Sequence, residues 1–301
     1  GYYLNVGQWW TVTPNIDAAI RVMPTQKEGF GFGVDAEYDF MNTPSSRLFR
    51  SQGSLKTLYT TEERGYTHFY HRQELRPDTV LLAQFEQWYD EDFYKDFYYD
   101  LYRDRTGPRT FVNVTQTRPN NILTATFAPS THNFTRETEK LPELALHHLE
   151  GEIAKNLYFS FDAAAGNYEH KRPRYNSARS INAARLTYDW NVAKWLNVAT
   201  YVQADASWYA RTLDDEQSEF RLAGTGGVTL QSRFQRAYAG RWGFSGFKHI
   251  IVPSVSYTYR PQTSLNAEDI PQFDGFDSAP GRGRIESKID NIFLGRDAES
   301  D

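Results

Sequence analysis

Charged side chains at every second position are the first candidates for chemistry in this chain. Residues 29–40 alternate large apolar side chains with glycines and carboxylates, and residues 16–22 alternate in the same way around an arginine. Successive side chains of a β-strand point to opposite faces, so the charges of each segment share a face. Carboxylates cannot face hydrocarbon, and we expect them to hydrate a wet interior or to contact a polar cargo. These candidates for a luminal wall are Arg21, Asp35, Glu37 and Asp39, with Asp17 beside them.

Known catalytic and metal-binding motifs do not occur in the sequence. Residues 29–33 are GFGFG rather than GxGxxG, and neither a GxSxG elbow nor an HExxH motif is present. His147 and His148 are adjacent, so on a strand they point to opposite faces and cannot bind one metal ion. The acidic residues lack the spacing of an EF-hand. We therefore predict a protein that is not an enzyme and that uses no cofactor and no metal.

The composition narrows the class of protein. The 301 residues include 7 Trp, 20 Tyr and 20 Phe, which is 16% aromatic, yet the mean hydropathy is −0.67. So many aromatic side chains exclude a disordered chain, and the lack of cysteine excludes a disulfide scaffold. There is no run of about 18 apolar residues that would form a transmembrane helix. The net charge of −5 argues against nucleic acid as a partner.

Period-two alternation recurs along the chain and predicts many strands. Residues 29–40 have about the length that a tilted strand needs to cross a bilayer. A repeat of about 20–25 residues for each strand and its connection gives roughly 12–14 strands. The predicted fold is all-β, an antiparallel transmembrane barrel of outer-membrane type, because such a barrel is polar on average although one face of its sheet is apolar. The alternating stretches are residues 16–22, 29–40, 55–60, 66–72, 79–89, 111–117, 122–128, 157–166, 183–190, 196–205, 227–234 and 254–259.

Aromatic side chains gather near the ends of the predicted strands. Rings with a polar edge favour the lipid–water interface, where they form the aromatic girdles of membrane barrels. An ordinary β-sandwich core is the alternative interpretation, but strands this long and this numerous do not fit a small sandwich. The rings are Tyr2, Tyr3, Trp9, Trp10, Tyr38, Phe40, Trp88, Tyr89, Trp190, Trp195, Trp208 and Tyr209.

Five stretches carry motifs of a known family. Residues 2–18 look like a strand of the form PYYWNIAPNYDAT, and residues 88–97 are similar to SDxxYFxDF. Residues 141–144 read LPEL, residues 249–259 resemble an LEPxxxYxY strand with an Asp-rich loop behind it, and residues 281–285 resemble GxxRI. Their order and spacing resemble the first half of the barrel domain of LptD, the outer-membrane lipopolysaccharide-assembly family. The motif residues are Asp90, Phe93, Tyr94, Asp96, Phe97, Pro253, Tyr257, Pro271, Asp274 and Asp277.

The resemblance implies a function and a cellular place. Family members have a periplasmic jelly-roll and a barrel of 26 strands in the bacterial outer membrane, and their first and last strands part to release lipopolysaccharide. Residues 1–301 are then expected to be a single fragment of the barrel domain, without the jelly-roll and the closing strands. The implied partners are lipopolysaccharide, outer-membrane lipids, an LptE-type plug lipoprotein and, through the missing jelly-roll, an LptA-type periplasmic bridge.

A lateral gate beside the first strand requires a weak seam, and proline weakens a seam because it has no N–H to donate. Pro14 matches the first seam proline of the family. The position of the second is occupied by Val22, and Pro24 follows two residues later. The predicted gate residues are Pro14, Asn15, Asp17, Val22 and Pro24.

Two other functions are compatible with a barrel. A complete porin or substrate-specific channel of about 14 strands is the main alternative, and strand closure distinguishes it from a fragment. An outer-membrane phospholipase or protease would need a Ser–His constellation or an acid pair in one extracellular cluster, and the sequence shows no such constellation. Residues 87–105 are expected to be either a short amphipathic helix or a charged aromatic loop.

Overall fold

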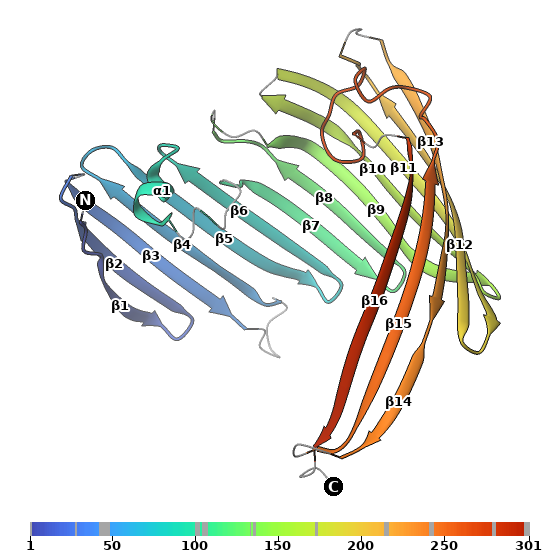
Figure 1. Cartoon of the computed structure of the whole chain (residues 1–301). Coiled ribbons are helices and arrows are strands. Elements are labelled where there is room, and N and C mark those ends of the chain that lie inside the picture. Colours follow the sequence, from blue (N-terminus) through green and yellow to red (C-terminus); the bar gives the residue numbers. More distant parts are fainter. Residues whose placement is uncertain are drawn as a thin grey trace. The chain divides into compact units, whose positions relative to one another are not determined.

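The strands of the computed structural model form one antiparallel sheet (Figure 1). Their order follows the sequence from β1 to β13; β15 then pairs with β13, β14 and β16. This sheet confirms the predicted all-β class. The structure describes residues 2–27, 29–41, 49–99, 103, 108–132, 134, 137–171, 174–213, 217–240, 244–278 and 281–297.

The elements begin and end close to the alternating stretches of the sequence. The first nine elements are β1 (Val6–Thr13), β2 (Ile16–Pro24), β3 (Phe30–Phe40), β4 (Ser51–Thr60), β5 (Gly65–Arg76), β6 (Thr79–Trp88), α1 (Phe93–Phe97), β7 (Phe111–Arg118) and β8 (Asn121–Ala128). The others are β9 (Thr138–Ala154), β10 (Leu157–Lys171), β11 (Arg174–Ala193), β12 (Leu196–Tyr209), β13 (Glu219–Ser232), β14 (Phe234–Ala239), β15 (Phe244–Arg260) and β16 (Arg282–Asp297).

In the described part of the chain the sheet has 16 strands, more than the 12–14 that the average spacing suggested. Two-residue turns, as at residues 14–15, 77–78 and 119–120, make the repeat shorter than expected. β13 and β14 pair with successive parts of β15, so they run along it as one interrupted strand. Residues 2–18, expected to belong to one first strand, contain the β1–β2 hairpin instead, because Pro14 and Asn15 form a turn.

The two faces of the sheet differ in chemistry, as the alternation predicted. On β3 the side chains of Phe30 and Phe32 are each 49% exposed, whereas Asp35 on the opposite face is 5% exposed. This arrangement inverts that of a soluble protein, in which an exposed apolar face of such extent is uncommon. Below, the face that carries Asp35 is called the polar face and the other the apolar face.

The chain divides into two compact units. Unit 1 comprises Gly1–Leu146 and Ala164–Arg179, and unit 2 comprises His147–Ala163 and Ser180–Asp301. The expectation of a single barrel domain over residues 1–301 remains a prediction. In the part of the chain that the structure describes, no helix has both the length and the apolar character needed to span a membrane.

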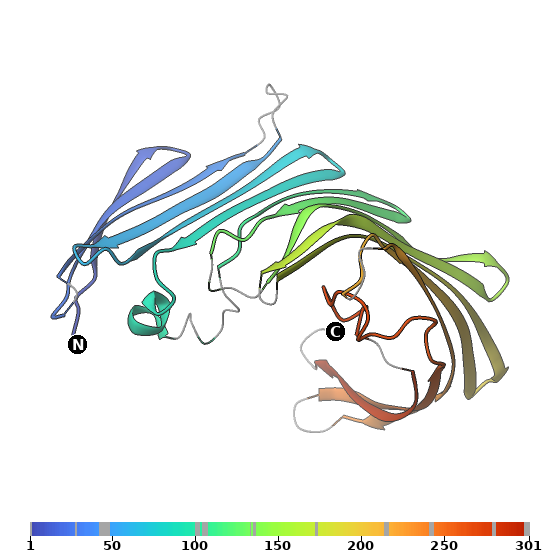
Figure 2. The same ribbon diagram turned by 90° about the horizontal axis from the view of Figure 1, so that it is seen from above.

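The connections of unit 1 differ at the two ends of its strands. Residues 14–15, 77–78 and 119–120 form two-residue turns at one end, where residues 41–50 also connect β3 to β4. The two longest connections, residues 89–110 and 129–137, are at the other end, together with the shorter ones at residues 25–29 and 61–64. The connection at residues 89–110 contains α1. This helix is five residues long and therefore too short to be stable without tertiary contacts. Figure 2 shows α1 lying against one side of the unit 1 sheet, and its contacts identify this side as the polar face.

Candidate functional site

The first hairpin holds the residues predicted for a lateral gate. Pro14 and Asn15 make the turn between β1 and β2. Asp17 and Val22 lie within β2 and point to opposite faces, because an odd number of positions separates them, and Pro24 is the last residue of the strand. The structure thus brings all five candidates into one hairpin and places two of them in its turn.

Pro24, rather than Pro14, weakens the pairing of β1 with β2. The carbonyl oxygen of Pro24 accepts a hydrogen bond from the backbone nitrogen of Leu4 at 3.1 Å. In an antiparallel ladder the N–H and C=O of one residue point to the same neighbour, so the nitrogen of Pro24 faces the β1 side with no hydrogen to donate. Pro14 lies outside the strands, where it removes no ladder bond.

Arg21 ties together four strands on the polar face. Its Nη2 lies 2.9 Å from Asp35 Oδ1 on β3 and 2.9 Å from the carbonyl oxygen of Thr57 on β4. The hydroxyl oxygen of Tyr66 on β5 is 3.0 Å from the same nitrogen. Asp35 is buried, and a buried carboxylate is tolerable only when it is paired and hydrogen-bonded. Arg21 and Asp35 therefore act as a structural cross-link beside the first hairpin.

The other predicted luminal residues form more exposed ion pairs on the same face. Glu37 Oε1 lies 3.6 Å from Lys56 Nζ, and Asp39 Oδ2 lies 2.6 Å from Arg50 Nη2. Asp17 is directly opposite Glu37 in the β2–β3 ladder, so the two side chains share a face. The structure thus brings the predicted charges into one row, in which Asp35 is buried and its neighbours remain accessible to water.

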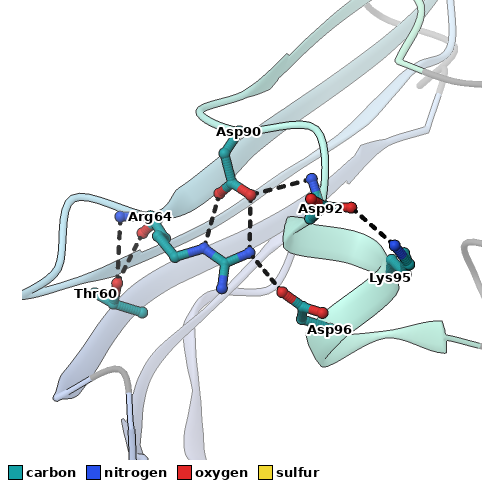
Figure 3. Close-up of polar contacts among 6 residues, drawn as sticks. All are labelled: Thr60, Arg64, Asp90, Asp92, Lys95 and Asp96. Atoms are coloured by element: carbon teal, nitrogen blue, oxygen red, sulfur yellow. Dashed lines mark hydrogen bonds and ion pairs between the residues drawn. The ribbon is translucent and has the colours of Figure 1, made fainter.

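Arg64 clasps the connection that carries α1 (Figure 3). This side chain, in the turn between β4 and β5, donates to Asp90 through Nε at 3.1 Å and through Nη2 at 2.8 Å. Its Nη2 also lies 2.9 Å from Asp96 Oδ2, and its guanidinium carbon lies 5.3 Å from the centroid of the Phe97 ring. The planar fork of arginine suits such a two-pronged contact with a carboxylate. We call this group, Arg64 with Asp90 and Asp96, the clasp.

An apolar cluster lies beneath the clasp, between α1 and the polar face. Phe93 is fully buried, and the Tyr94 ring stacks on Trp88 with 4.5 Å between centroids. Burial of aromatic side chains supplies the energy that a five-residue helix lacks. Within residues 87–105, expected to be a short helix or a loop, the structure thus has the short helix α1; residues 100–102 and 104–107 lie outside the described residues. The buried members of the cluster are Met23, Leu58, Tyr66, Trp88, Phe93, Tyr94 and Phe97.

The α1 connection also reaches the segment that leads into β1. The hydroxyl of Tyr3 donates to the carbonyl oxygen of Phe97 at 2.8 Å, and their rings meet edge to face with 5.9 Å between centroids. Burial raises the pKa of Tyr98, the next residue, to about 12, so its hydroxyl stays protonated at neutral pH. The first hairpin and α1 are thus coupled by direct contacts.

Asp277 organises the connection between β15 and β16 in unit 2. Its Oδ1 accepts a hydrogen bond from the Tyr209 hydroxyl at 2.6 Å, and both residues are fully buried. Its Oδ2 accepts from the backbone nitrogens of Phe273 at 2.8 Å and Asp274 at 3.1 Å. Asp277 therefore anchors the loop, with Pro271 also buried in it.

The strand part of the same motif lies apart from this anchor. Tyr257 is 44% exposed on the apolar face of β15, and Pro253 shares that face because an even number of positions separates the two. Within the described ranges, the structure contains no cluster of three or more side chains suited to hold a metal ion.

Several structural residues escaped sequence reasoning. Arg64 and Tyr3 each interact with a residue far away in the chain, at separations of 26 and 94 positions. Arg64 follows two acidic residues in an ordinary turn, and nothing in the neighbouring sequence distinguishes it from the other arginines of the chain. Tyr209 and Trp88, both predicted as girdle residues, are instead buried. Tyr209 lies against Asp277, 68 positions later, and Trp88 belongs to the cluster beneath the clasp.

Comparison with known proteins supplies independent information on this architecture. The model of the family LptD, described as LPS transport system D, matches residues 62–287. The matched range includes the clasp and the β15–β16 connection and begins after β4, so the first hairpin precedes it. A search of curated proteins finds no match to the chain.

Proposed function

Because the chain belongs to the LptD family of lipopolysaccharide transport, we propose that it inserts lipopolysaccharide into the outer leaflet through a lateral gate beside its first strand, β1. The family is an outer-membrane β-barrel family, and its members are transport and assembly components. Lipopolysaccharide is accordingly the cargo, and proteins of the same transport system are the partners. The finer assignments below are proposals.

The pairing of β1 carries the gate proposal. β1 has eight residues, all of them exposed, and β2 is its neighbour in the described sheet. The ladder runs in register from Val6 to Thr11 and becomes irregular at Thr13. At the edge of the described sheet, so short a strand offers few ladder bonds to a partner strand across the seam. Each bond contributes about 0.5–1.5 kcal/mol net, so that pairing would be easy to part. The donor that Pro24 lacks also loosens the hairpin that holds β1.

The row of charges supports a route for the polar part of the cargo. Asp17, Arg21, Glu37 and Asp39 lie beside the hairpin on the polar face, where water can solvate sugars and phosphates. The apolar face would contact the outer-membrane lipids. We assign the end with the α1 connection to the cell exterior, because outer-membrane barrels keep their short turns in the periplasm.

The partner assignments follow from the family and the proposed orientation. An LptE-type plug lipoprotein would occupy the polar interior, and an LptA-type bridge would deliver the cargo through a periplasmic jelly-roll that is linked to this barrel. Both contacts belong to the proposal.

A photocrosslinking amino acid on β1 tests the gate. Trp10 on β1 and Val112 on β7 both face the apolar side of the sheet. Their side chains are similarly exposed, Trp10 at 49% and Val112 at 43%. We expect lipopolysaccharide to label position 10 more strongly than position 112 during active transport. Equal labelling would contradict the gate, because bulk membrane lipopolysaccharide reaches both positions. The alternative, a substrate-specific channel, predicts uptake of small solutes without preferential labelling at β1.

A further inference from the structure

Unit 2 contains a polar pocket on the polar face of its sheet. Its volume is about 480 Å³, within the range of about 300–1,000 Å³ for sites that hold small molecules. The floor is formed by β12, β13, β15 and β16, and Gly275 and Ser278 of the β15–β16 connection also line it. Figure 2 shows this connection folded over the sheet of unit 2.

The strand register places three arginines together in this pocket. Arg260 is opposite Arg282, and Thr258 is opposite Arg284, so their side chains share one face. The neighbouring residues Tyr257, Tyr259 and Ile285 are on the apolar face, 44%, 52% and 73% exposed. Alternation thus directs the guanidinium groups into the pocket and the hydrophobic groups out of it.

Arg260 is held rigidly at the base of the pocket. Its Nη2 lies 2.9 Å from Oδ2 of Asp205, whose side chain is 1% exposed, and its Nε donates to Thr225 Oγ1 at 3.2 Å. A buried carboxylate that holds an arginine keeps its planar group in place. Arg260 is therefore oriented before any ligand arrives.

The two arginines of β16 are more exposed and available to a ligand. Arg284 pairs with Glu286 at 2.8 Å, but the two side chains are 61% and 54% exposed, and such surface pairs contribute little. With Asp205 behind Arg260 included, three arginines stand against two carboxylates, so the site keeps one positive charge in excess, whereas the whole chain carries a net charge of −5. A local excess of arginine in an acidic protein favours an anionic ligand.

The remaining lining groups suit a phosphorylated sugar. Arginine forks match the oxygens of a phosphate, and hydroxyl groups such as those of Ser256 and Thr258 can bond to sugar hydroxyls. Asp277 and Tyr209 hold the connection above, so the position of Ser278 is supported by buried contacts. The pocket is thus bounded by the strands and by the β15–β16 connection, contains the fixed guanidinium group of Arg260, and is larger than a single ion requires.

We propose that this pocket binds a phosphate monoester of a saccharide, with Arg260, Arg282 and Arg284 holding the phosphate. The assignment of the saccharide rests on the proposed transport of lipopolysaccharide, a phosphorylated glycolipid. The pocket is then a place where the head group of the cargo rests on the polar face of unit 2.

Calorimetric binding to the purified, folded chain in detergent tests the proposal with glucose 6-phosphate, glucose and inorganic phosphate as probes. We expect glucose 6-phosphate to bind more tightly than inorganic phosphate, and glucose not to bind. The double variant Arg282→Gln, Arg284→Gln should weaken binding by about tenfold or more, because charge-assisted hydrogen bonds are lost. The control is Lys288→Gln, on the same face of β16 but paired with Asp290 outside the pocket.

Three results would overturn the assignment. They are absence of binding by the unaltered chain, unchanged binding by the double variant, and equal affinity for inorganic phosphate, which would indicate a site for the free ion. Arg282→Lys, which keeps the charge but not the fork, should give intermediate affinity and so separates recognition from misfolding. The calorimetric test requires no transport, so absence of binding would not contradict the gate proposal. Equal labelling of positions 10 and 112 would contradict the gate but not the pocket.

Discussion

Replacing Arg64 by alanine should release the α1 connection while leaving the sheet intact. The paired contact with Asp90 contributes about 1.5 kcal/mol, the low end for hydrogen bonds to charged groups, because Asp90 is 32% exposed. The contact with Asp96, which is 50% exposed, adds about 0–1 kcal/mol, and the approach to the Phe97 ring adds about 0.5–1 kcal/mol. The sum is about 2–3.5 kcal/mol, or about a 30- to 370-fold increase in opening of the loop.

Hydrogen exchange of the α1 amides measures this opening directly. The backbone nitrogens of Asp96 and Tyr98 donate to Asp92 and Tyr94 at 2.9 and 2.8 Å, so their exchange reports the helix. The control is Arg72→Ala, which breaks one pair with Glu74 on β5. Exchange in Arg64→Ala within about threefold of the unaltered chain would refute the clasp, because it would leave less than about 0.7 kcal/mol for all its contacts.

Three further predictions concern other contacts. Pro24→Ala restores a donor facing the segment that leads into β1 and should strengthen the first hairpin by about 0.5–1.5 kcal/mol. This should be seen as slower amide exchange in the hairpin, whereas Pro14→Ala in the turn should change it little. Asp277→Ala leaves buried donors unpaired at about 1–3 kcal/mol each and should free the β15–β16 connection to proteolysis; Tyr209→Phe should have a smaller effect. His132, in the connection between β8 and β9, accepts a hydrogen bond at Nε2 from the Trp88 backbone nitrogen at 2.8 Å. Burial lowers its pKa, so His132 binds protons more readily when this connection is unfolded than when it is folded. The stability of the connection should be complete above about pH 6.5 and fall as the pH drops through the lowered pKa, measured by Trp88 amide exchange; a flat profile would contradict this.

The strands were largely predictable because alternation is a local property. Successive residues of a strand point to opposite faces, so the two faces of residues 30–40 can be assigned from the sequence without knowing which strands lie beside them. β9, β14 and β16 were harder to recognise, since their sequences alternate less cleanly. The first hairpin shows a similar limit: the Pro14–Asn15 turn was visible in the sequence, but the resemblance of residues 2–18 to a single strand obscured it.

The candidate site was only partly predictable for a different reason. The acidic row on β3 is a consequence of period two, and its exposure to one face could be inferred. The sequence offered no means to tell that Asp35 is buried against Arg21 while Asp39 pairs with Arg50 at the surface. That difference depends on which strand lies next to which, and on what covers the sheet.

By itself, then, the sequence determined the class of fold, the apolar and polar faces of its strands, and the family. Only the tertiary structure decided which distant residues meet. Arg64 and Asp90, Tyr3 and Phe97, and the arginines of the unit 2 pocket come together through strand register and through loops that fold back over the sheet. Those contacts join residues many positions apart, whose pairing no local period encodes, because it is set by the packing energy of the whole arrangement.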